Sequence, residues 1–486
     1  MTMTYATYLT GDDLRQVHEA SLEILERVGM LVRNEKAHAL LARHGCLSQA
    51  GSPLVKFPRK VIEEFRASMP PTFTFHARDP RFDRTLPTDA PVIITGSSAP
   101  NLIDPVSGKE RRATSEDIAR IARLVNELPG YDVFSISTLA EDAPPGYYSL
   151  ARLMPTLKNC LKPLRISSLD EEDAGRTLRL GVLVAGSEAA YRERPFITHH
   201  TCPVVSPLTF DMDSTEMLLY YVERGYPYYG SIVPNAGLTS PMSLPATLAQ
   251  GNAEFLAYAA LTEMVKPGSP LIYSTLPTVA DMRTGAYAPG GIECAMLHMG
   301  FAQMARFYNV PCGGYIGLTN SKVNDAQAGY ETGMSVVAGL LGGVGMFNMS
   351  GLLDSLLAFD FAKAVIDDEI AMMLRRLGRG FEFAHSAMAL DVLADVGPGG
   401  TFMFHEHTVE HMRSTNYVPT LADRDPREKW VEKGGLDTQA RAMERVRQIL
   451  TREYDSCLAP EIEARIRAEF KDMVRGDCLP PAEWAK

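Results

Sequence analysis

The feature that most constrains how this chain can fold is a unit that repeats through its middle: a short apolar run of strand character, a helical pattern, then the next apolar run. Five of the runs closely follow a proline or a Gly-X pair, which marks where each strand begins. Capping residues mark helices as well: Thr10 with Asp13, Thr114 with Asp117, and Asp437. The eight apolar runs are residues 92–96, 133–137, 164–168, 196–201, 228–233, 271–275, 313–317 and 344–349.

Strands that alternate with helices form parallel sheets with right-handed crossovers, and eight such units close most naturally into a (β/α)8 barrel, the TIM barrel. The alternative is an open, doubly wound sheet, which more often carries a glycine-rich phosphate turn after its first strand; Gly-Ser-Ser-Ala-Pro at 96–100 is not one. We therefore predict an α/β protein in three parts. Residues 1–88 form a helical extension packed on the barrel, residues 89–415 the barrel, and residues 416–486 a C-terminal helical segment and tail.

Composition narrows the class of protein. A net charge of −11 disfavours binding to nucleic acid and to anionic membranes. The most apolar stretch, 335–357, contains five glycines together with Asn348, Ser350 and Asp354, so we interpret it as buried core and not as a membrane span. Residues 1–13 have no signal pattern, and the seven cysteines include no Cys-x-x-Cys pair. We expect reduced thiols and a cytoplasmic protein.

In such a barrel the functional site lies at the carboxyl ends of the strands. The residues there are neutral and rich in hydroxyl groups, and they lack the lysine and the paired carboxylates that an aldolase or a glycosidase needs. Hydroxyl groups can also simply satisfy backbone groups at the strand ends. The residues concerned are Ser97, Ser98, Asn101, Ser137, Thr138, Ser167, Ser168, His199, His200, Cys202, Ser231, Asn235, Ser274, Thr275, Thr319, Asn320, Asn348 and Ser350.

The loop after the seventh strand, residues 319–331, holds more polar groups than one helix start requires. We predict that it is functional, with Lys322, Asp325 and Gln327 as its catalytic candidates. The alternative is a plain helix N-terminus capped by Asn324 or Asp325.

Two groups of histidines are candidates for catalysis or metal binding. Adjacent strand residues point to opposite faces, so only one of His199 and His200 can enter the barrel, and alternation puts His200 on the face of Thr198 and Cys202. A second group, at 405–411, resembles a zinc site in spacing, but Val409 stands where a His-Glu-x-x-His motif needs its second histidine. We predict no metal.

Five spaced motifs resemble those of the trimethylamine methyltransferase family. They are Ala-Gln-Gly-Asn-Ala-Glu at 249–254, Asp-Met-Arg-Thr-Gly at 281–285, Asp-Ala-Gln-Ala-Gly-Tyr-Glu at 325–331, Asp-Asp-Glu-Ile at 367–370 and Val-Gly-Pro-Gly-Gly at 396–400. The resemblance implies a barrel that transfers a methyl group from an amine to the cobalt of a corrinoid. Founding members carry pyrrolysine in the barrel.

The matching region here, 313–320, has ordinary residues, so the chain resembles the pyrrolysine-free branch, whose known members act on betaine-type quaternary amines. It departs from the family pattern at Asn320 and Asn324, where Asp and Pro are usual. The expected substrate is glycine betaine, or proline betaine or carnitine. Because the chain has no Asp-x-His-x-x-Gly signature, we expect the corrinoid (cobalamin) to arrive on a separate partner protein. We also expect a homo-oligomer.

A quaternary nitrogen needs no protonation to leave, so the protein must chiefly hold the cation, expose one methyl group and exclude water. Ring faces suit such a cation, which donates no hydrogen bond. Asp325 would offset its charge, Gln327 would orient a carboxylate or water, and Lys322 would contact the corrinoid partner. The predicted substrate-binding residues are Asn101, His200, Tyr273, Arg283, Tyr315, Asn348 and Phe359, with Arg283 for the substrate carboxylate.

Two other functions remain open at this point. A TIM-barrel lyase would need a base at the mouth, with His200 or Lys322 as the candidate. A barrel that binds quaternary amines without transferring a methyl group is the other.

Overall fold

A computed structural model of the chain describes residues 5–349, 351–381, 383 and 385–484. Its centre is a sheet of eight parallel strands, which confirms all eight predicted runs and the predicted barrel. The sheet closes where Ile94 pairs with Val133, next to β9. Around the barrel the strands are β6 (Val92–Ile94), β9 (Phe134–Ser135), β10 (Leu164–Ile166), β11 (Ile197–Thr201), β14 (Tyr228–Ile232), β16 (Tyr273–Thr275), β18 (Cys312–Gly314) and β19 (Met346–Asn348).

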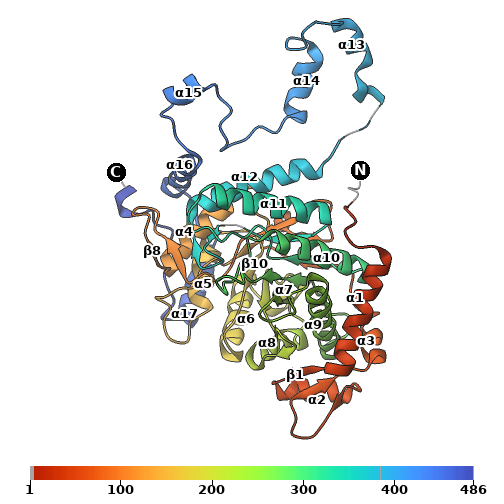
Figure 1. Cartoon of the computed structure of the whole chain (residues 1–486). Coiled ribbons are helices and arrows are strands. Elements are labelled where there is room, and N and C mark those ends of the chain that lie inside the picture. The colour runs from red at the N-terminus through yellow and green to blue at the C-terminus, as the bar shows by residue number, and fades with distance from the viewer. Residues whose placement is uncertain (1–4, 350, 382, 384, 485–486) are drawn as a thin grey trace.

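Helices follow the strands and surround the barrel (Figure 1). The predicted capping boxes are present: Thr10 with Asp13 begins α1, and Thr114 with Asp117 begins α4. Each box satisfies backbone N–H groups that the first helical turn leaves free. The barrel helices are α4 (Ser115–Glu127), α5 (Leu150–Asn159), α6 (Glu171–Ala185), α8 (Met212–Glu223), α9 (Leu244–Val265), α10 (Ile292–Tyr308), α11 (Ala326–Gly342) and α12 (Phe361–Gly378).

An apolar plug fills the amino-terminal half of the barrel. It is built by the hairpin of β4 (Phe73–Phe75) and β5 (Arg84–Leu86), whose phenylalanine rings lie 5.8 and 6.1 Å from the ring of Tyr229. The plug leaves only the carboxyl end of the barrel for a site. Its residues are Phe73, Phe75, Leu86, Val92, Ile94, Val133, Tyr229, Ile272 and Met346.

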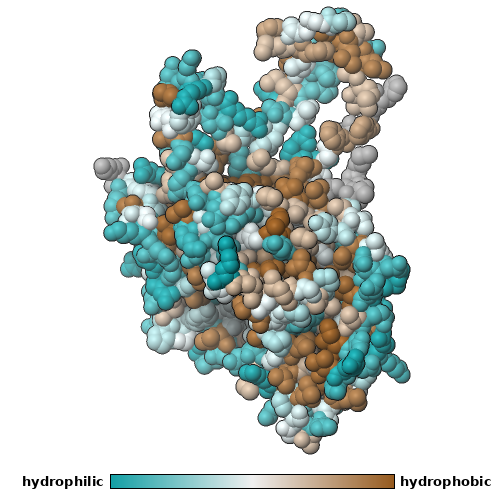
Figure 2. Space-filling view, viewed as in Figure 1, coloured by the Kyte–Doolittle hydropathy of each residue, from teal (hydrophilic) through white to brown (hydrophobic). Residues whose placement is uncertain are grey.

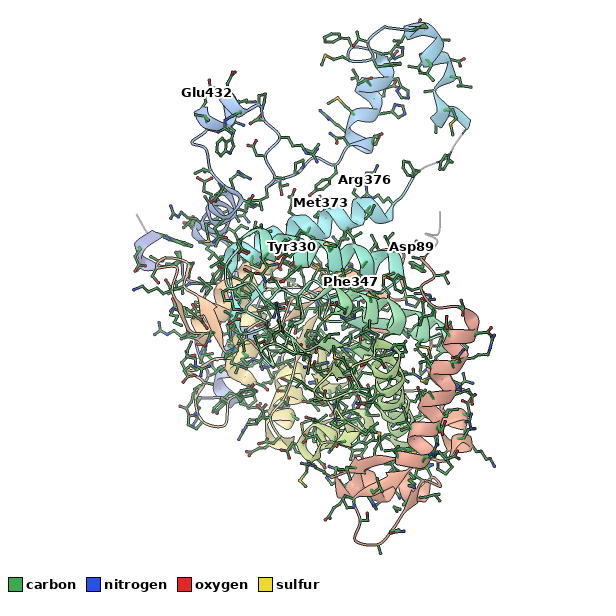
Figure 3. The ribbon with its side chains drawn as sticks, in the orientation of Figure 1. Asp89, Tyr330, Phe347, Met373, Arg376 and Glu432 are labelled. Carbon is green, nitrogen blue, oxygen red and sulfur yellow. The ribbon has the colours of Figure 1, made fainter. Side chains whose placement is uncertain are left out.

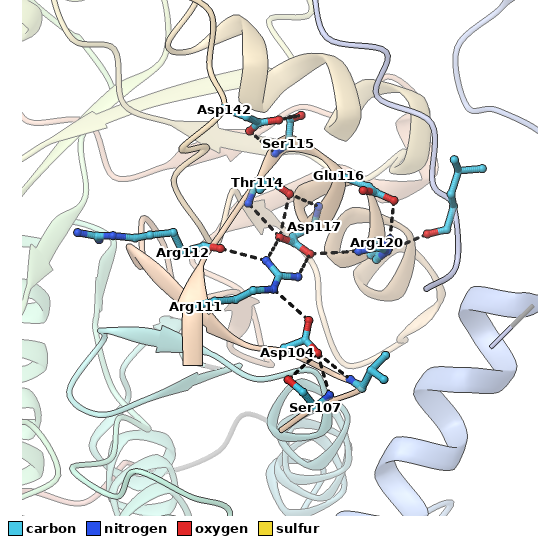
Figure 4. Close-up of polar contacts among 12 residues, drawn as sticks. Asp104, Ser107, Arg111, Arg112, Thr114, Ser115, Glu116, Asp117, Arg120 and Asp142 are labelled. Carbon is cyan, nitrogen blue, oxygen red and sulfur yellow. Dashed lines mark hydrogen bonds and ion pairs between the residues drawn. The ribbon is translucent and has the colours of Figure 1, made fainter. Parts of the chain in front are cut away.

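A small sheet of four strands stands beside the mouth of the barrel, between the first and last βα units. Arg111 fixes this sheet to α4, because its guanidinium donates to Asp117 at 2.7 and 2.8 Å and to Asp104 at 3.0 Å (Figure 4). Asp117 is also the third residue of the α4 capping box, so one carboxylate joins helix and sheet. The strands, in order, are β20 (Leu352–Leu353), β21 (Ala358–Phe359), β7 (Asn101–Ile103) and β8 (Glu110–Arg112).

The N-terminal region packs against the barrel through α1 (Gly11–Glu23) and a second small sheet, in which β1 (Met30–Val32) pairs with β13 (Thr209–Phe210). At the other end of the chain, α16 (Thr438–Thr451) begins at the predicted cap Asp437 and packs on α4 and α12. Among the described residues, no helix combines the length and the apolar character needed to cross a membrane.

The chain leaves the body after α12, whereas the sequence suggested a barrel region running to residue 415. The arm, as we call residues 379–381, 383 and 385–415, projects away from the barrel (Figure 1). Its helices are α13 (Leu390–Val396) and α14 (Glu406–Thr415), neither of which has a buried residue. Figure 2 shows apolar side chains gathered on this projection. The segment then returns along α15 (Arg427–Glu432) to α16.

Candidate active site

Above the plug, the barrel interior is polar and centres on Arg165. Its guanidinium donates to the hydroxyls of Tyr229 (3.1 Å), Ser97 (3.0 Å) and Tyr315, and it lies 3.4 Å from Nδ1 of His200. Arg165 comes from the middle of β10, and alternation along that short strand turns its side chain inward. The sequence reading missed this residue, although an arginine inside a predicted buried strand was a usable signal.

Arg165 is 2% exposed, and all the hydrogen bonds found for its guanidinium in the described chain are to neutral groups. Arg152 on α5 lies beside the same space. It is 1% exposed, donates to Ser98 at 3.1 Å and to two backbone carbonyls, and leaves Nη1 without a hydrogen-bond partner in the described chain. Buried guanidinium groups without a carboxylate in ion-pair contact favour an anionic ligand.

His200 enters the barrel and His199 does not, as alternation predicted. His200 Nε2 lies 2.8 Å from Ser231 Oγ, which in turn lies 2.8 Å from Ser274 Oγ. The ring of His199 instead stacks on Tyr221 of α8, with centroids 3.6 Å apart. Burial, and then the charge of Arg165, hold the pKa of His200 well below its usual value. His200 is therefore neutral at physiological pH and a weak base.

Two buried polar side chains near this network carry atoms without hydrogen-bond partners in the described chain. Asn348, at the end of β19, is fully buried and uses neither its amide oxygen nor its nitrogen; it faces the Tyr229 hydroxyl without completing a hydrogen bond. The Tyr287 hydroxyl is likewise unpaired, and burial raises its pKa. Tyr287 was not predicted, because it lies twelve residues beyond the end of its strand. Unsatisfied buried groups of this kind suit a ligand.

The interior encloses a cavity of about 20 Å³, room for roughly one water molecule. Its walls include Arg152, Arg165 and His200 together with Ser97, Ser98, Ser135, Ile166 and Ser167. A much larger apolar hollow of about 770 Å³ lies outside the barrel between α1, α9 and α10. We assign the site to the small cavity, because the outer hollow has few polar groups to orient a substrate and is separate from the Arg165 network.

The predicted substrate-binding residues divide between four places. His200, Tyr315 and Asn348 lie in the interior network. Asn101 and Phe359 lie on the small sheet beside the mouth, where Asn101 donates to Glu110 and Phe359 packs edge-on against Phe361.

Tyr273 and Arg283 lie elsewhere. Tyr273 points out of the barrel: its ring stacks on Phe255 of α9 at 3.7 Å and its hydroxyl donates to Asn252. Its neighbour Ser274 takes the inward position, so the aromatic prediction for Tyr273 is corrected by alternation. Arg283 is on an exposed loop, where it pairs with Asp281 at 2.6 Å. Ser350 lies outside the described residues.

The predicted catalytic residues lie in the loop after β18. Asp325 is the N-cap of α11, accepts from Ala328 N at 3.1 Å and is exposed. This hydrogen bond, together with one from the Ser321 hydroxyl, lowers the pKa of Asp325. Lys322 is exposed and lies 3.3 Å from Asp354. Gln327 donates to Glu331, which also accepts from Thr319 at 2.6 Å, so this carboxylate organises the loop. The placement favours the capping role for Asp325; a catalytic role for the three residues remains a prediction.

The second histidine group lies on the arm. His405 caps α14 and lies 3.3 Å from Asp395, and the rings of His407 and His411 stack with centroids 4.1 Å apart. Among the described residues, no group of three His, Cys, Asp or Glu side chains is arranged to hold a metal ion.

The family-like motifs mainly join elements. Asn252 on α9 donates to Ser21 of α1 and Tyr308 of α10, both at 2.8 Å. Glu254 accepts from Leu208 N at 2.9 Å, which holds the hairpin before α8. Asp368 accepts from Gly130 N, and Glu369 accepts from Thr420 and Leu421. These carboxylates satisfy backbone groups and do not point into the interior network.

A model of the trimethylamine methyltransferase family matches residues 2–475. A glycine betaine methyltransferase from Desulfitobacterium hafniense (strain Y51) is 34% identical over 95% of this chain and 95% of that protein. A trimethylamine methyltransferase from Desulfitobacterium hafniense (strain DSM 10664 / DCB-2) is 28% identical over 94% of this chain and 92% of that protein. Another, from Methanosarcina barkeri, is 25% identical over 96% of this chain and 93% of that protein. The similarity thus extends over nearly the whole chain and confirms the resemblance seen in the motifs.

Proposed function

Because the chain belongs to the trimethylamine methyltransferase family, we propose that it transfers a methyl group from a quaternary amine that carries a carboxylate, with glycine betaine as the first candidate, to the cobalt of a corrinoid on a separate protein. The single observation that supports this choice of substrate is Arg165, a buried guanidinium whose hydrogen bonds within the described chain all go to neutral groups. A substrate carboxylate would supply the missing negative charge.

The hydroxyls of Ser97 and Tyr315 hold Arg165 in the absence of substrate. A carboxylate can replace them and accept two parallel hydrogen bonds from the guanidinium fork, which are stronger than those to neutral oxygen. The cavity of about 20 Å³ is too small for a whole betaine, so binding requires the Tyr315 ring to move.

The orientation of the substrate follows from the depth of Arg165. With the carboxylate on Arg165, the ammonium group points away from the guanidinium and towards the mouth, since like charges repel. Tyr315 and Tyr287 would supply aromatic rings for the cation, and Asn348, whose amide atoms have no hydrogen-bond partner in the described chain, would supply an amide oxygen. One methyl group then faces outward, where an acceptor can reach it.

The reaction needs little acid or base. When the methyl carbon moves to the acceptor, the N–C bond breaks, its electron pair stays on nitrogen, and a tertiary amine leaves with an uncharged nitrogen and its carboxylate intact. The corrinoid, when bound, supplies Co(I) as the nucleophile. The protein orients the substrate and excludes water. A lyase is less well supported, because the pKa of His200 is strongly lowered and Lys322 is exposed beside Asp354.

The rim of the barrel suits a protein partner that presents the corrinoid. Leu238, Met242 and Met282 are each more than half exposed. A side chain placed at Gly237 would lie 2.8 Å from the sulfur of Met282 and 3.0 Å from that of Met242, so the two methionines converge. Flexible, polarisable methionines are common on surfaces that bind partners.

The test is methyl transfer to free Co(I) cobalamin, followed by its visible spectrum. Glycine betaine, proline betaine, carnitine, tetramethylammonium and trimethylamine are compared at equal concentration. We expect methylation with a carboxylate-bearing quaternary amine and not with tetramethylammonium or trimethylamine. Turnover of trimethylamine while all betaines are inert would refute the proposal. Calorimetric binding of a betaine without transfer, to cobalamin or to a cognate corrinoid protein, would identify a binding barrel instead.

A further inference from the structure

The arm exposes apolar side chains to solvent in the single chain. Phe381 is 81% exposed and Phe404 is 85% exposed. With Phe383 they leave on the order of 400 Å² of aromatic surface in solvent, and the rings of Phe381 and Phe383 lie 6.2 Å apart. Further exposed apolar residues of the arm are Met388, Leu390, Leu393, Phe402, Met403, Val409 and Met412.

A second exposed apolar surface lies on α11. Tyr330, Met334, Val337 and Leu341 follow one another at helical spacing and are all exposed; we call them the α11 face. The 17-residue helix has one charged residue, Glu331, and that carboxylate turns inward to Thr319 and Asn320. A surface helix without charges on its outer face is typical of the core of an interface, where charged residues are depleted.

Two glycines on α11 would allow the backbone of another protein chain to approach the α11 face closely. A side chain added at Gly329 or Gly333 would meet no heavy atom of the described chain within 4 Å. Met373 and Leu377 of the neighbouring α12 extend the apolar surface. Tyr330 and Met373 lie on the side of the body that the arm overhangs (Figure 3).

The arm is held at its base. Arg376 of α12 donates to the carbonyl of Gly380 at 3.4 Å and to that of Thr415 at 3.0 and 3.2 Å, so one side chain joins both ends of the arm. Gly378 lies beside Leu340 in the last turn of α11. The base therefore sits next to the α11 face.

The base also lies far from the barrel mouth. Arg375 pairs at 2.8 Å with Asp132, which precedes β9 and so marks the amino-terminal end of the strands. A partner that approaches the mouth meets the opposite end of the barrel.

We propose that the arm of one copy packs on the α11 face of a second copy, and the reverse, in a twofold symmetric dimer. A twofold axis pairs each arm with the other copy's α11 face, because both surfaces lie on the same side of the molecule. Two arms and two faces provide area on the order of the 1,200–2,000 Å² that stable interfaces bury. An anionic membrane is disfavoured by the charge of this segment, since the sequence from 379 to 415 has five acidic residues and two arginines; the acidic residues are Glu382, Asp391, Asp395, Glu406 and Glu410. The proposal does not depend on the chemistry in the barrel.

The test is the mass of the full chain by light scattering and native mass spectrometry at micromolar concentration. The parent is expected at twice 53.4 kDa. The arm variant Phe381→Ser/Phe404→Ser and the face variant Met334→Glu are each expected at the monomer mass. Mixed together, they should form a heterodimer through the one arm–face pair that stays intact, with affinity at least tenfold below that of the parent.

Leu47→Ser is the matched control, since Leu47 is 61% exposed but lies on β2 (Leu47–Ser48) in the N-terminal sheet. It should remain a dimer, and all variants should keep the parental circular dichroism spectrum. A parental mass that is not an even multiple of the chain mass, an arm variant that dimerises as tightly as the parent, or a mixture that does not form the heterodimer would overturn the proposal. The proposal would also be overturned if the full chain were monomeric on its own and its arm were shielded from solvent only when a corrinoid protein is bound.

Discussion

The interior of the barrel and the arm depart from the usual distribution of side chains in opposite directions. In the barrel, Arg165 and Asn348 are buried although they are charged or polar. On the arm, Phe381 and Phe404 are exposed although they are apolar. A buried charge without an ion-pair partner and a large apolar surface in water are both costly for a chain on its own. Each therefore indicates a molecule that the single chain lacks: an anionic ligand in the first region and a second protein surface in the other.

The two regions also differ in how firmly they are held. Eight strands and the plug fix the depth of the interior network, whereas one side chain, Arg376, joins the two ends of the arm. Substitutions in the barrel should therefore change chemistry and leave assembly intact, and substitutions on the arm should do the reverse. The following predictions test the barrel side of this comparison.

Arg165→Met should have the largest effect. It removes the proposed carboxylate partner, and losing one side of a buried charge pair costs about 3 kcal/mol, or roughly 150-fold in kcat/KM. Stability should change little, because removing the cost of a buried charge offsets the hydrogen bonds that Tyr229, Ser97 and Tyr315 lose. Initial rates of cobalamin methylation and the melting temperature measure the two effects.

Arg283→Met is the matched comparison, since Arg283 was the carboxylate partner expected from the sequence and is exposed beside Asp281. It should change kcat/KM less than twofold. If Arg283→Met reduces the rate 100-fold and Arg165→Met does not, the carboxylate binds at the rim and the proposed orientation of the substrate is wrong.

Asn348→Leu should raise the stability of the protein and lower its rate of methyl transfer. The amide has two buried atoms without partners in the described chain, and each such atom costs about 1–3 kcal/mol. Leucine of similar shape removes that cost, so the free energy of unfolding should rise by roughly 2 kcal/mol. The rate of methyl transfer should fall about tenfold, because a ligand contact is lost. A variant that is both less stable and fully active would show that Asn348 serves the fold alone.

His199→Phe should change the pH dependence of stability. Burial lowers the pKa of His199 from 6.5 to about 3, so the folded protein keeps this ring neutral while the unfolded chain takes up a proton below pH 6.5. The parent therefore loses stability as the pH falls from 6.5 towards 3. Phenylalanine keeps the stack on Tyr221 and does not titrate. Its advantage over the parent should grow by roughly 2 kcal/mol between pH 7.5 and pH 5, measured by urea unfolding.

Methyl transfer at pH 7 should be unchanged in His199→Phe, because this ring lies outside the barrel interior. An equal advantage at both pH values would mean that His199 titrates normally and that the helix layer around it admits water.

The sequence specified much of the fold because each barrel strand and helix has a local signal. The eight apolar runs, and the capping residues Thr10, Thr114 and Asp437, all appear where they were expected. The arm was not foreseen, because helical patterns such as that around His407 and His411 reveal a helix but not what it packs on. Packing partners depend on contacts between distant residues, and local patterns carry no such information.

The site was predictable only where alternation applied. Alternation along β11 puts His200 inside and His199 outside, and the same rule along β16 turns Tyr273 out towards α9. Arg165 does not stand at a strand end, where a barrel site is expected; its long side chain reaches the network from the middle of β10. Tyr287 enters from a loop whose path no local pattern determines.

The smallest effects are expected in the loop after β18, where two substitutions at Asp325 separate a cap from a catalytic group. Asparagine can still accept a hydrogen bond from Ala328 N, so Asp325→Asn should keep the melting temperature of the parent. Asp325→Ala removes the cap and should lower that temperature by about 1–2 °C, a small shift because the chain is long. Since the carboxylate is exposed and already accepts from Ser321 and Ala328, we expect both variants to methylate cobalamin within twofold of the parental rate. A fold-neutral Asp325→Asn that loses more than tenfold in rate would instead show that its negative charge acts on the substrate cation, and the functional prediction for this loop would stand.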